Sequence, residues 1–428
     1  MKKKLSPGRI IVLGFAMVIL IGALLLLLPI SNRSGVKVSF IDALFTSTSA
    51  VCVTGLATVD LGDSFNVLGR SIIAILIQIG GLGVATFGAS IVLLSHKRIG
   101  LKERVVLKEG LNLDSINGVV RLVRSVLLYT LLFEAIGVLL NFIVFVKDYK
   151  PLSALGISIF HSISAFNNAG FDILGGFRGL TVYRGNVLLT LTTSFLIIFG
   201  GLGFIVIREI KAKKSLSKLS MHAKIVLSMT MGLLLIGTVL LKLTENCSWL
   251  DAFFHSVSAR TAGFSTISLG SFTAPGLLIM IVLMFIGASP GSTGGGIKTT
   301  TAFTILNSIF SMSQNKVPSA FKRRISMESI TKAYTIAGLG ILIIIVNTLL
   351  CLVLEPAYSF TQILFEVVSA FGTVGLSTGI TPAFGSLTKL ILCITMFIGR
   401  LGPLTMATIW SYKAAVRATY GEEKIIIG

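Results

Sequence analysis

Long apolar runs alternate along this chain with short amphiphilic segments and with clusters of basic residues. Four charge-free runs are each long enough to cross a bilayer, which takes roughly 20 residues of helix. The first run is too long for a cleaved signal peptide and lacks a small-residue cleavage site, so we expect a retained membrane helix. The four runs cover residues 10–32, 71–95, 185–207 and 333–354.

The composition strengthens this interpretation. The chain has 428 residues, of which 54% are hydrophobic and only 13% are charged. A soluble domain of this size needs more charge on its surface. The fold class that we predict is therefore an all-α membrane protein with several crossings.

An internal repeat organises the chain, and such repeats reveal architecture. Each copy has an aromatic residue, then a Ser-Ala pair, then four or five residues that end in glycine. A long apolar run precedes each copy, and a second apolar run with its own glycines follows it. The copies are FTSTSAVCVTGLAT (45–58), FHSISAFNNAGFDI (160–173), FFHSVSARTAGFST (253–266) and LFEVVSAFGTVGLST (364–378), with aligned glycines Gly55, Gly170, Gly263 and Gly375.

The amphiphilic part of each copy offers only about 10 helix-compatible residues, which are too few to span a bilayer. We expect four re-entrant pore helices, each followed by a loop that is tolerated at membrane depth because protein or water surrounds it. Four such helix–pore-loop–helix units give eight transmembrane helices around a pseudo-fourfold pore. The units that we predict are residues 1–110, 111–220, 221–322 and 323–428.

The net charge of +20 is concentrated between pairs of apolar runs. Segments rich in lysine and arginine remain in the cytoplasm, so this placement predicts cytoplasmic loops and two cytoplasmic termini. We interpret the charge as topology and expect no nucleic-acid binding. The basic segments are residues 2–9, 96–108, 208–218, 321–332 and 412–424.

The four stretches CVTG, NNAG, RTAG and GTVG share a glycine that can bend the backbone, whereas their side chains differ. This pattern points to backbone carbonyls as ligands of a monovalent cation, aided by the negative C-terminal end of each pore helix. No acidic residue occurs in the stretches, which disfavours a calcium or magnesium site. The predicted cation-binding positions are Cys52, Val53, Thr54, Gly55, Asn167, Asn168, Ala169, Gly170, Arg260, Thr261, Ala262, Gly263, Gly372, Thr373, Val374 and Gly375.

Asp172 follows the second of these stretches, and we expect it at the outer mouth, where it would concentrate cations. The alternative for all four segments is that they are ordinary extracellular turns between helices.

A second unusual stretch, GASPGSTGGGIK (287–298), interrupts the last apolar run of the third unit. Glycine, serine and proline at this density break a helix, and we expect the other three units to continue as helix here. The functional interpretation is a mobile loop across the permeation path, and the alternative is a plain kink. The predicted gating residues in the loop are Gly291, Ser292, Thr293, Gly294, Gly295, Gly296 and Lys298.

Arg400 lies in the middle of an apolar run, where a charge is costly unless protein groups or water hold it. We predict that it lies in the pore and donates to the carbonyls of the 291–296 segment, where its charge opposes cation passage. A structural bond elsewhere in the bundle is the alternative. Glu134 is also placed within an apolar run, and we expect it to make a polar contact inside the bundle.

These features together resemble the Trk/Ktr/HKT superfamily of potassium transporters. The resemblance covers essentially the whole chain, and GGIKTTT (295–301) with FIGRLGPLT (397–405) is most like the bacterial Ktr membrane subunit of the KtrB or KtrD type. It implies that the protein takes up potassium, often with stimulation by sodium. It also implies that potassium binds at the positions given above. It carries the family's pore arginine onto Arg400 and its intramembrane loop onto residues 288–296. In the first stretch Cys52 departs from the family pattern and would make the pore sensitive to thiol reagents.

The resemblance further implies a homodimer in the bacterial plasma membrane, surrounded by lipid, with a cytosolic ring of RCK-domain regulatory subunits. The resemblance implies that this ring binds ATP or ADP. This chain contains no glycine-rich dinucleotide fingerprint after a strand, so any nucleotide must bind a partner. We expect no cofactor in this chain other than potassium ions.

Two other functions are alternatives to potassium permeation. A symporter that couples potassium to sodium or protons has the same sequence features. A membrane-embedded enzyme would need convergent catalytic groups, whereas His161 and His255 occupy offset positions with no partner motif. We therefore expect no enzymatic activity. The four cysteines, Cys52, Cys247, Cys351 and Cys393, lack metal-type spacing and are predicted to be small buried apolar residues.

Overall fold

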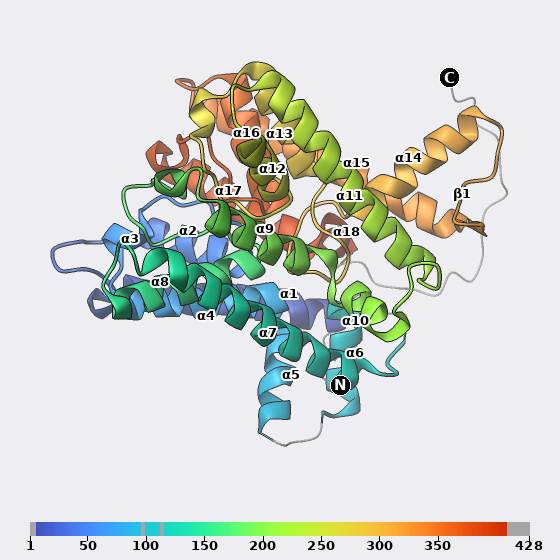
Figure 1. Ribbon diagram of the computed structural model, residues 1–428, viewed down its shortest axis with the longest axis horizontal. Helices are drawn as coiled ribbons and strands as arrows, with labels where there is room; N and C mark the ends of the chain where they lie inside the picture. Colours follow the sequence, from blue (N-terminus) through green and yellow to red (C-terminus); the bar gives the residue numbers. More distant parts are fainter. Residues whose placement is uncertain (1–5, 96–98, 112–114, 409–428) are drawn as a thin grey trace, which may run out of the picture.

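The computed structural model describes residues 6–95, 99–111 and 115–408, and nearly all of its regular structure is helical (Figure 1). The prediction of an all-α membrane protein is confirmed. In the described ranges one hairpin pairs β1 (Ser319–Ala320) with β2 (Arg323–Arg324). The basic segment 412–424 lies outside the described residues, as do residues 2–5 of the first basic segment and 96–98 of the second.

One order of elements recurs four times: a long helix, a short helix, a connecting segment, and a second helix that is interrupted. The long helices are α1 (Pro7–Leu27), α7 (Val119–Phe145), α11 (Met221–Thr244) and α15 (Met327–Leu354). The short helices are α2 (Phe40–Val51), α8 (Pro151–Phe166), α12 (Trp249–Ser258) and α16 (Phe360–Gly372). The interrupted helices are α4 (Val67–Leu82) with α5 (Val84–Leu94), α9 (Val187–Leu202) with α10 (Phe204–Lys213), α13 (Ala274–Phe285) with α14 (Thr299–Ser313), and α17 (Ser386–Leu401) with α18 (Pro403–Thr408).

We call these four sets unit 1 to unit 4. Smaller elements connect or extend them: η1 (Pro29–Ser31), α3 (Leu61–Ser64), α6 (Leu101–Gly110), η2 (Thr181–Tyr183), η3 (Leu269–Ser271) and η4 (Thr381–Ala383).

The short helices begin where a side chain satisfies the first free backbone N–H groups. Ser39, Ser248 and Ser359 accept a hydrogen bond from the backbone N–H three residues later, at 3.1–3.3 Å. In unit 2 the helix α8 begins instead with Pro151, which has no N–H to satisfy. The short helices are 12, 16, 10 and 13 residues long, so none of them is long enough to span a bilayer.

The second helix of each unit is broken. The sequence predicts a single break, at residues 287–298, and continuous helices in the other units, and that prediction is wrong. Instead α4 meets α5 at 100° and α9 meets α10 at 92°, so that α5 leaves the bundle sharply (Figure 1). The breaks fall at Gly83, Gly203 and Gly402, whose φ angles of +82°, +91° and +91° are costly for any residue except glycine. In unit 3 the interruption is longer and covers residues 286–298.

Four helices are long and apolar enough to cross a membrane: α1, α7, α11 and α15. The two bent pairs bring the number to six within the described residues. The predicted eight crossings also count α13 and α17, which have only 12 and 16 residues because each is interrupted. Large apolar side chains point outward from the long helices, as a lipid environment allows; Met17 of α1 is 63% exposed.

The four units pack into a closed ring. The second helix of each unit contacts the short helix of the next one, in the pairs α4 with α8, α9 with α12, α13 with α16, and α17 with α2. An ion pair of 2.8 Å between Lys389 of α17 and Asp42 of α2 joins the last unit to the first. The short helices are therefore held around one centre, where the loops that follow them come together.

Candidate functional site

The four aligned glycines meet at the centre of the ring. A Cβ atom added to any one of them would collide with the carbonyl oxygen that precedes the glycine of the next unit. The separation is 2.5 Å in the first three pairs, where a Cβ has no room. The facing residues are Gly55 with Ala169, Gly170 with Ala262, Gly263 with Val374, and Gly375 with Thr54. We call residues 52–55, 167–170, 260–263 and 372–375 the axial ring.

A second conformational feature recurs in the axial ring. The residue two positions before each glycine also has a left-handed backbone: Val53, Asn168, Thr261 and Thr373, with φ of 51°, 58°, 67° and 51°. Such a backbone costs roughly 1–2 kcal/mol for an L-residue. Three of the four are β-branched, for which it is a true outlier. A costly conformation that recurs in every unit indicates that function depends on the path of the backbone.

The serine of each Ser-Ala pair supports the loop that follows, a role that the sequence analysis does not assign. Ser49 accepts from the backbone N–H of Thr54 at 2.8 Å through its carbonyl, and from that of Gly55 at 3.1 Å through its hydroxyl. Ser369 makes the same two bonds, to Val374 at 2.9 Å and Gly375 at 3.1 Å. The equivalent serines of units 2 and 3 are Ser164 and Ser258, which also bond their loops. The signal was visible, because the pair occurs in all four repeats.

All sixteen predicted cation-binding residues lie in the axial ring, but their side chains do not act alike. The guanidinium of Arg260 turns away from the ring, and its Nη2 donates to Thr230 of α11 at 3.3 Å. Cys52 is fully buried, so a thiol reagent would need access from within the ring. Ion binding at these positions stays a prediction.

The 287–298 loop lies directly against the axial ring and contacts units 2 and 4. Its Thr293 donates its backbone N–H to Gly200 at 3.2 Å, next to the break in unit 2. Its Gly295 donates to the hydroxyl of Thr373 at 3.0 Å, and Gly296 donates to the carbonyl of Gly399 at 3.3 Å. The interruption of unit 3 is therefore a packed structure between the breaks of its neighbours and differs from a plain kink.

Two cations hold this loop through its carbonyl groups. The Arg400 guanidinium donates to the carbonyl of Thr293, and its Nη2 also donates to Gly80 and, at 3.1 Å, to Gly81. The Lys298 ammonium donates to the carbonyls of Gly294 at 2.6 Å and Gly295 at 3.3 Å. Arg400 thus joins units 3, 4 and 1.

The bonds from Arg400 to unit 1 are not in the sequence analysis. A signal for them existed: IGGLG (79–83), FGGLG (199–203) and IGRLG (398–402) align, so Arg400 takes the position of a glycine in the broken helices of units 1 and 2.

Glu134 belongs to a buried polar cluster behind the axial ring. Its carboxylate accepts a hydrogen bond of 3.1 Å from the amide of Asn167, which also donates to Gln78 at 2.8 Å. Glu134 is 8% exposed. The predicted polar contact of Glu134 inside the bundle is therefore a hydrogen bond with Asn167 of the axial ring.

Other predicted groups have ordinary partners. Asp172 is partly buried and accepts from the backbone N–H of Leu174 at 3.0 Å. His161 pairs with the hydroxyl of Thr193 at 2.9 Å, and Nδ1 of His255 pairs with the carbonyl of Asp251 at 2.9 Å. The two histidines therefore bond within separate units. All four cysteines are buried and free, as predicted.

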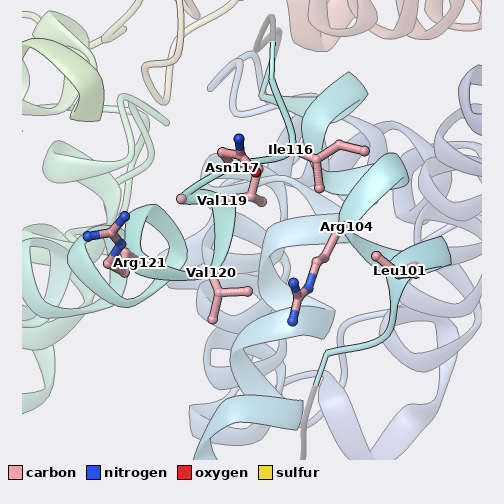
Figure 2. A pocket seen from close by; sticks show the side chains of 8 residues that line it. Leu101, Arg104, Ile116, Asn117, Val119, Val120 and Arg121 are labelled. Carbon is pink, nitrogen blue, oxygen red and sulfur yellow. The ribbon is translucent and has the colours of Figure 1, made fainter.

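An open pocket of 470 Å³ lies away from the ring, between α6 and the start of α7 (Figure 2). Arg104 and Arg121 both line it, together with the apolar side chains of Leu101 and Ile116. It borders the second basic segment of the chain, so it offers positive charge at the end of the molecule that the sequence analysis places in the cytoplasm.

The closed ring of four units, the axial glycines and the interrupted second helices define a membrane transport protein. The chain belongs to the TrkH family of cation transport proteins, whose family model matches residues 9–244 and 223–415. The resemblance to the Trk and Ktr transporters is confirmed, and the family is one of transporters and not of enzymes.

Several relatives match over most of their length. The potassium/sodium uptake protein NtpJ of Enterococcus hirae is 38% identical and covers 100% of this chain and 98% of its own. Ktr system potassium uptake protein B of Bacillus subtilis is also 38% identical, over 99% of this chain and 97% of its own. The crystal structure of the potassium transporter TrkH from Vibrio parahaemolyticus has a TM-score of 0.74, with 16% identity over 96% of this chain and 87% of that chain. It shows the shared fold.

Proposed function

We propose that this chain takes up potassium ions across the bacterial cell membrane by channel-like permeation through the axial ring. The observation that carries the proposal is the closed contact of four glycine loops, all with the same left-handed backbone two residues earlier. The names of the relatives, potassium/sodium uptake protein and Ktr potassium uptake protein B, support potassium as the ion.

Selection would depend on the carbonyl oxygens of the ring. A ring of carbonyls replaces the hydration shell of a monovalent cation, and the four short helices direct the negative ends of their dipoles toward it. The serine bonds behind each loop would hold these carbonyls in place. Side chains such as that of Arg260 contribute little, because they turn away from the ring.

The 287–298 loop would act as the gate. It packs against the ring, and Arg400 and Lys298 place two positive charges beside it. One unit charge about 4 Å from a cation opposes it by about 4 kcal/mol at an effective dielectric constant of ~20. Moving the loop would require Arg400 to release Thr293, so this arginine would stabilise the closed state.

The test compares wild type with a deletion of residues 291–296 and with Arg400→Ala, in liposomes, by rubidium or potassium flux. We expect both changes to raise flux, with the deletion giving the larger rise. Unchanged or lower flux in a deletion variant that elutes as a folded protein would contradict the gate. A strict requirement for an imposed sodium or proton gradient would instead indicate a coupled symporter.

The regulation would come from a partner. We propose a homodimer with both termini in the cytoplasm, stimulated by sodium and controlled by a ring of RCK-domain subunits that bind ATP or ADP. The basic segments 96–104 and 208–218, and the arginines of the pocket in Figure 2, would dock that ring partly by charge. Full nucleotide control of flux in liposomes that contain this chain alone would contradict the partner.

A further inference from the structure

The four left-handed residues of the axial ring differ in a way that follows the position of the 287–298 loop. Units 2, 3 and 4 have polar residues there, Asn168, Thr261 and Thr373, whereas unit 1 has Val53. The side chains of these three polar residues face the loop. The side chain of Val53 has no hydrogen-bonding atom. Unit 1 is bonded instead by Arg400, through Gly80 and Gly81.

Among these three polar residues, the shortest hydrogen bond to the loop is in unit 4. The backbone N–H of Gly295 donates to the hydroxyl of Thr373 at 3.0 Å, and both residues are buried. Loss of this hydroxyl would leave a buried N–H group without a partner, which is costly in a site closed to water. The bond therefore stabilises the arrangement in which loop and ring are in contact.

Units 2 and 3 make a matching contact with the other side of the loop. The amide of Asn168 donates to the hydroxyl of Thr261 at 3.2 Å. The hydroxyl of Thr293 in the loop lies 3.4 Å from the amide oxygen of Asn168, and it donates to the carbonyl of Phe166 at 3.3 Å. One short chain of hydrogen bonds thus links two units of the ring to the loop.

The glycines of the loop permit this close approach. A Cβ atom on Gly294 would collide with the hydroxyl of Thr261, and one on Gly295 would collide with the side chain of Thr373. The composition of the loop is thus matched to the side chains of the ring as well as to the need for a break in the helix.

We propose that Asn168, Thr261 and Thr373 form a latch, through which the conformation of the axial ring and the position of the 287–298 loop are coupled. The latch rests on the proposed function of that loop as a gate. When the loop leaves, the costly left-handed backbones at these positions lose the partners of their side chains, so the ring would relax. Because such coupling is reciprocal, ions in the ring would in turn change the loop equilibrium.

The test measures rubidium flux into liposomes for Thr373→Val, which keeps the β-branched shape and removes the hydroxyl. We expect flux to rise about fivefold, the change in equilibrium that the loss of one typical buried hydrogen bond produces. Thr373→Ser retains the hydroxyl, so its flux should rise less than that of Thr373→Val. The control is Thr238→Val in α11, where the hydroxyl bonds only Leu234 of its own helix, at 2.6 Å.

The deciding measurement repeats Thr373→Val in the chain that lacks residues 291–296. A latch acts only through the loop, so the substitution should then change flux no further. The same change in both backgrounds would mean that Thr373 acts on the ring alone, and the latch would be wrong. If Thr373→Val does not fold, Thr293→Val tests the same contact from the loop and should raise flux. If flux rises on loop deletion but in neither Thr373→Val nor Thr293→Val, the latch is wrong and the gate stands. If flux does not rise on loop deletion, the gate itself is wrong.

Discussion

At the scale of single residues, backbone conformation is what the four loops of the axial ring share. Their glycines could be predicted from the sequence, because a bend between an amphiphilic helix and an apolar run favours glycine. The left-handed backbones of Val53, Thr261 and Thr373 could not, because β-branched residues disfavour that conformation and only the packed fold imposes it. The roles of the side chains could not be predicted either. Nothing in the sequence indicates that Arg260 turns away from the ring toward Thr230.

Glu134 offers a prediction at this scale. Glu134→Ala removes the carboxylate that accepts from Asn167 and leaves that buried amide with fewer partners, which should lower stability by about 1–3 kcal/mol. Glu134→Gln keeps an oxygen acceptor and should be much closer to wild type. Thermal unfolding in detergent checks the two variants; equal stability of Ala and Gln would show that the bond to Asn167 contributes little.

At the scale of elements, glycine breaks shape the second helices. The long break at 287–298 could be predicted, since glycine, serine and proline are dense there. The breaks at Gly83, Gly203 and Gly402 could not, because glycine is tolerated within a helix and nothing local shows its φ angle. These breaks direct backbone carbonyls, such as those of Gly80 and Gly81, toward Arg400.

Two of these breaks form a matched pair of tests. Gly203→Ala and Gly83→Ala force alanine into the same positive-φ backbone, with ψ of 133° and 137°, at roughly 1–3 kcal/mol each. Only at Gly203 does the added Cβ meet the loop, 2.5 Å from the carbonyl of Pro290, whereas Gly83 has open space. We therefore expect a rise in rubidium flux for Gly203→Ala alone. Equal flux in the two variants would show that the break in unit 2 does not hold the loop.

At the scale of the whole molecule, four repeats close into a ring. The repeats themselves could be predicted, because they align on one glycine. The order in which the units contact each other could not, since it depends on pairs far apart in the sequence, such as Asp42 and Lys389.

This ring-closing pair gives a third prediction. The two side chains are only 16% and 11% exposed, so removing one partner leaves a poorly hydrated charge. Lys389→Met should lower stability by about 3 kcal/mol, near the lower end for a buried pair. The double variant Asp42→Asn with Lys389→Met should recover part of that loss, as thermal unfolding would show. A double variant less stable than Lys389→Met would mean that the two charges do not act as a pair.

The central claim is that ions cross the membrane through the axial ring, where backbone carbonyls bind them. Its most direct test is potassium uptake at low potassium, with sodium as competitor, in liposomes that contain wild type or one of Gly55→Ser, Gly170→Ser, Gly263→Ser and Gly375→Ser. A side chain at any of these positions collides with the next unit, so each variant should lose affinity for potassium or preference over sodium. Unchanged uptake and selectivity in all four folded variants would contradict the claim.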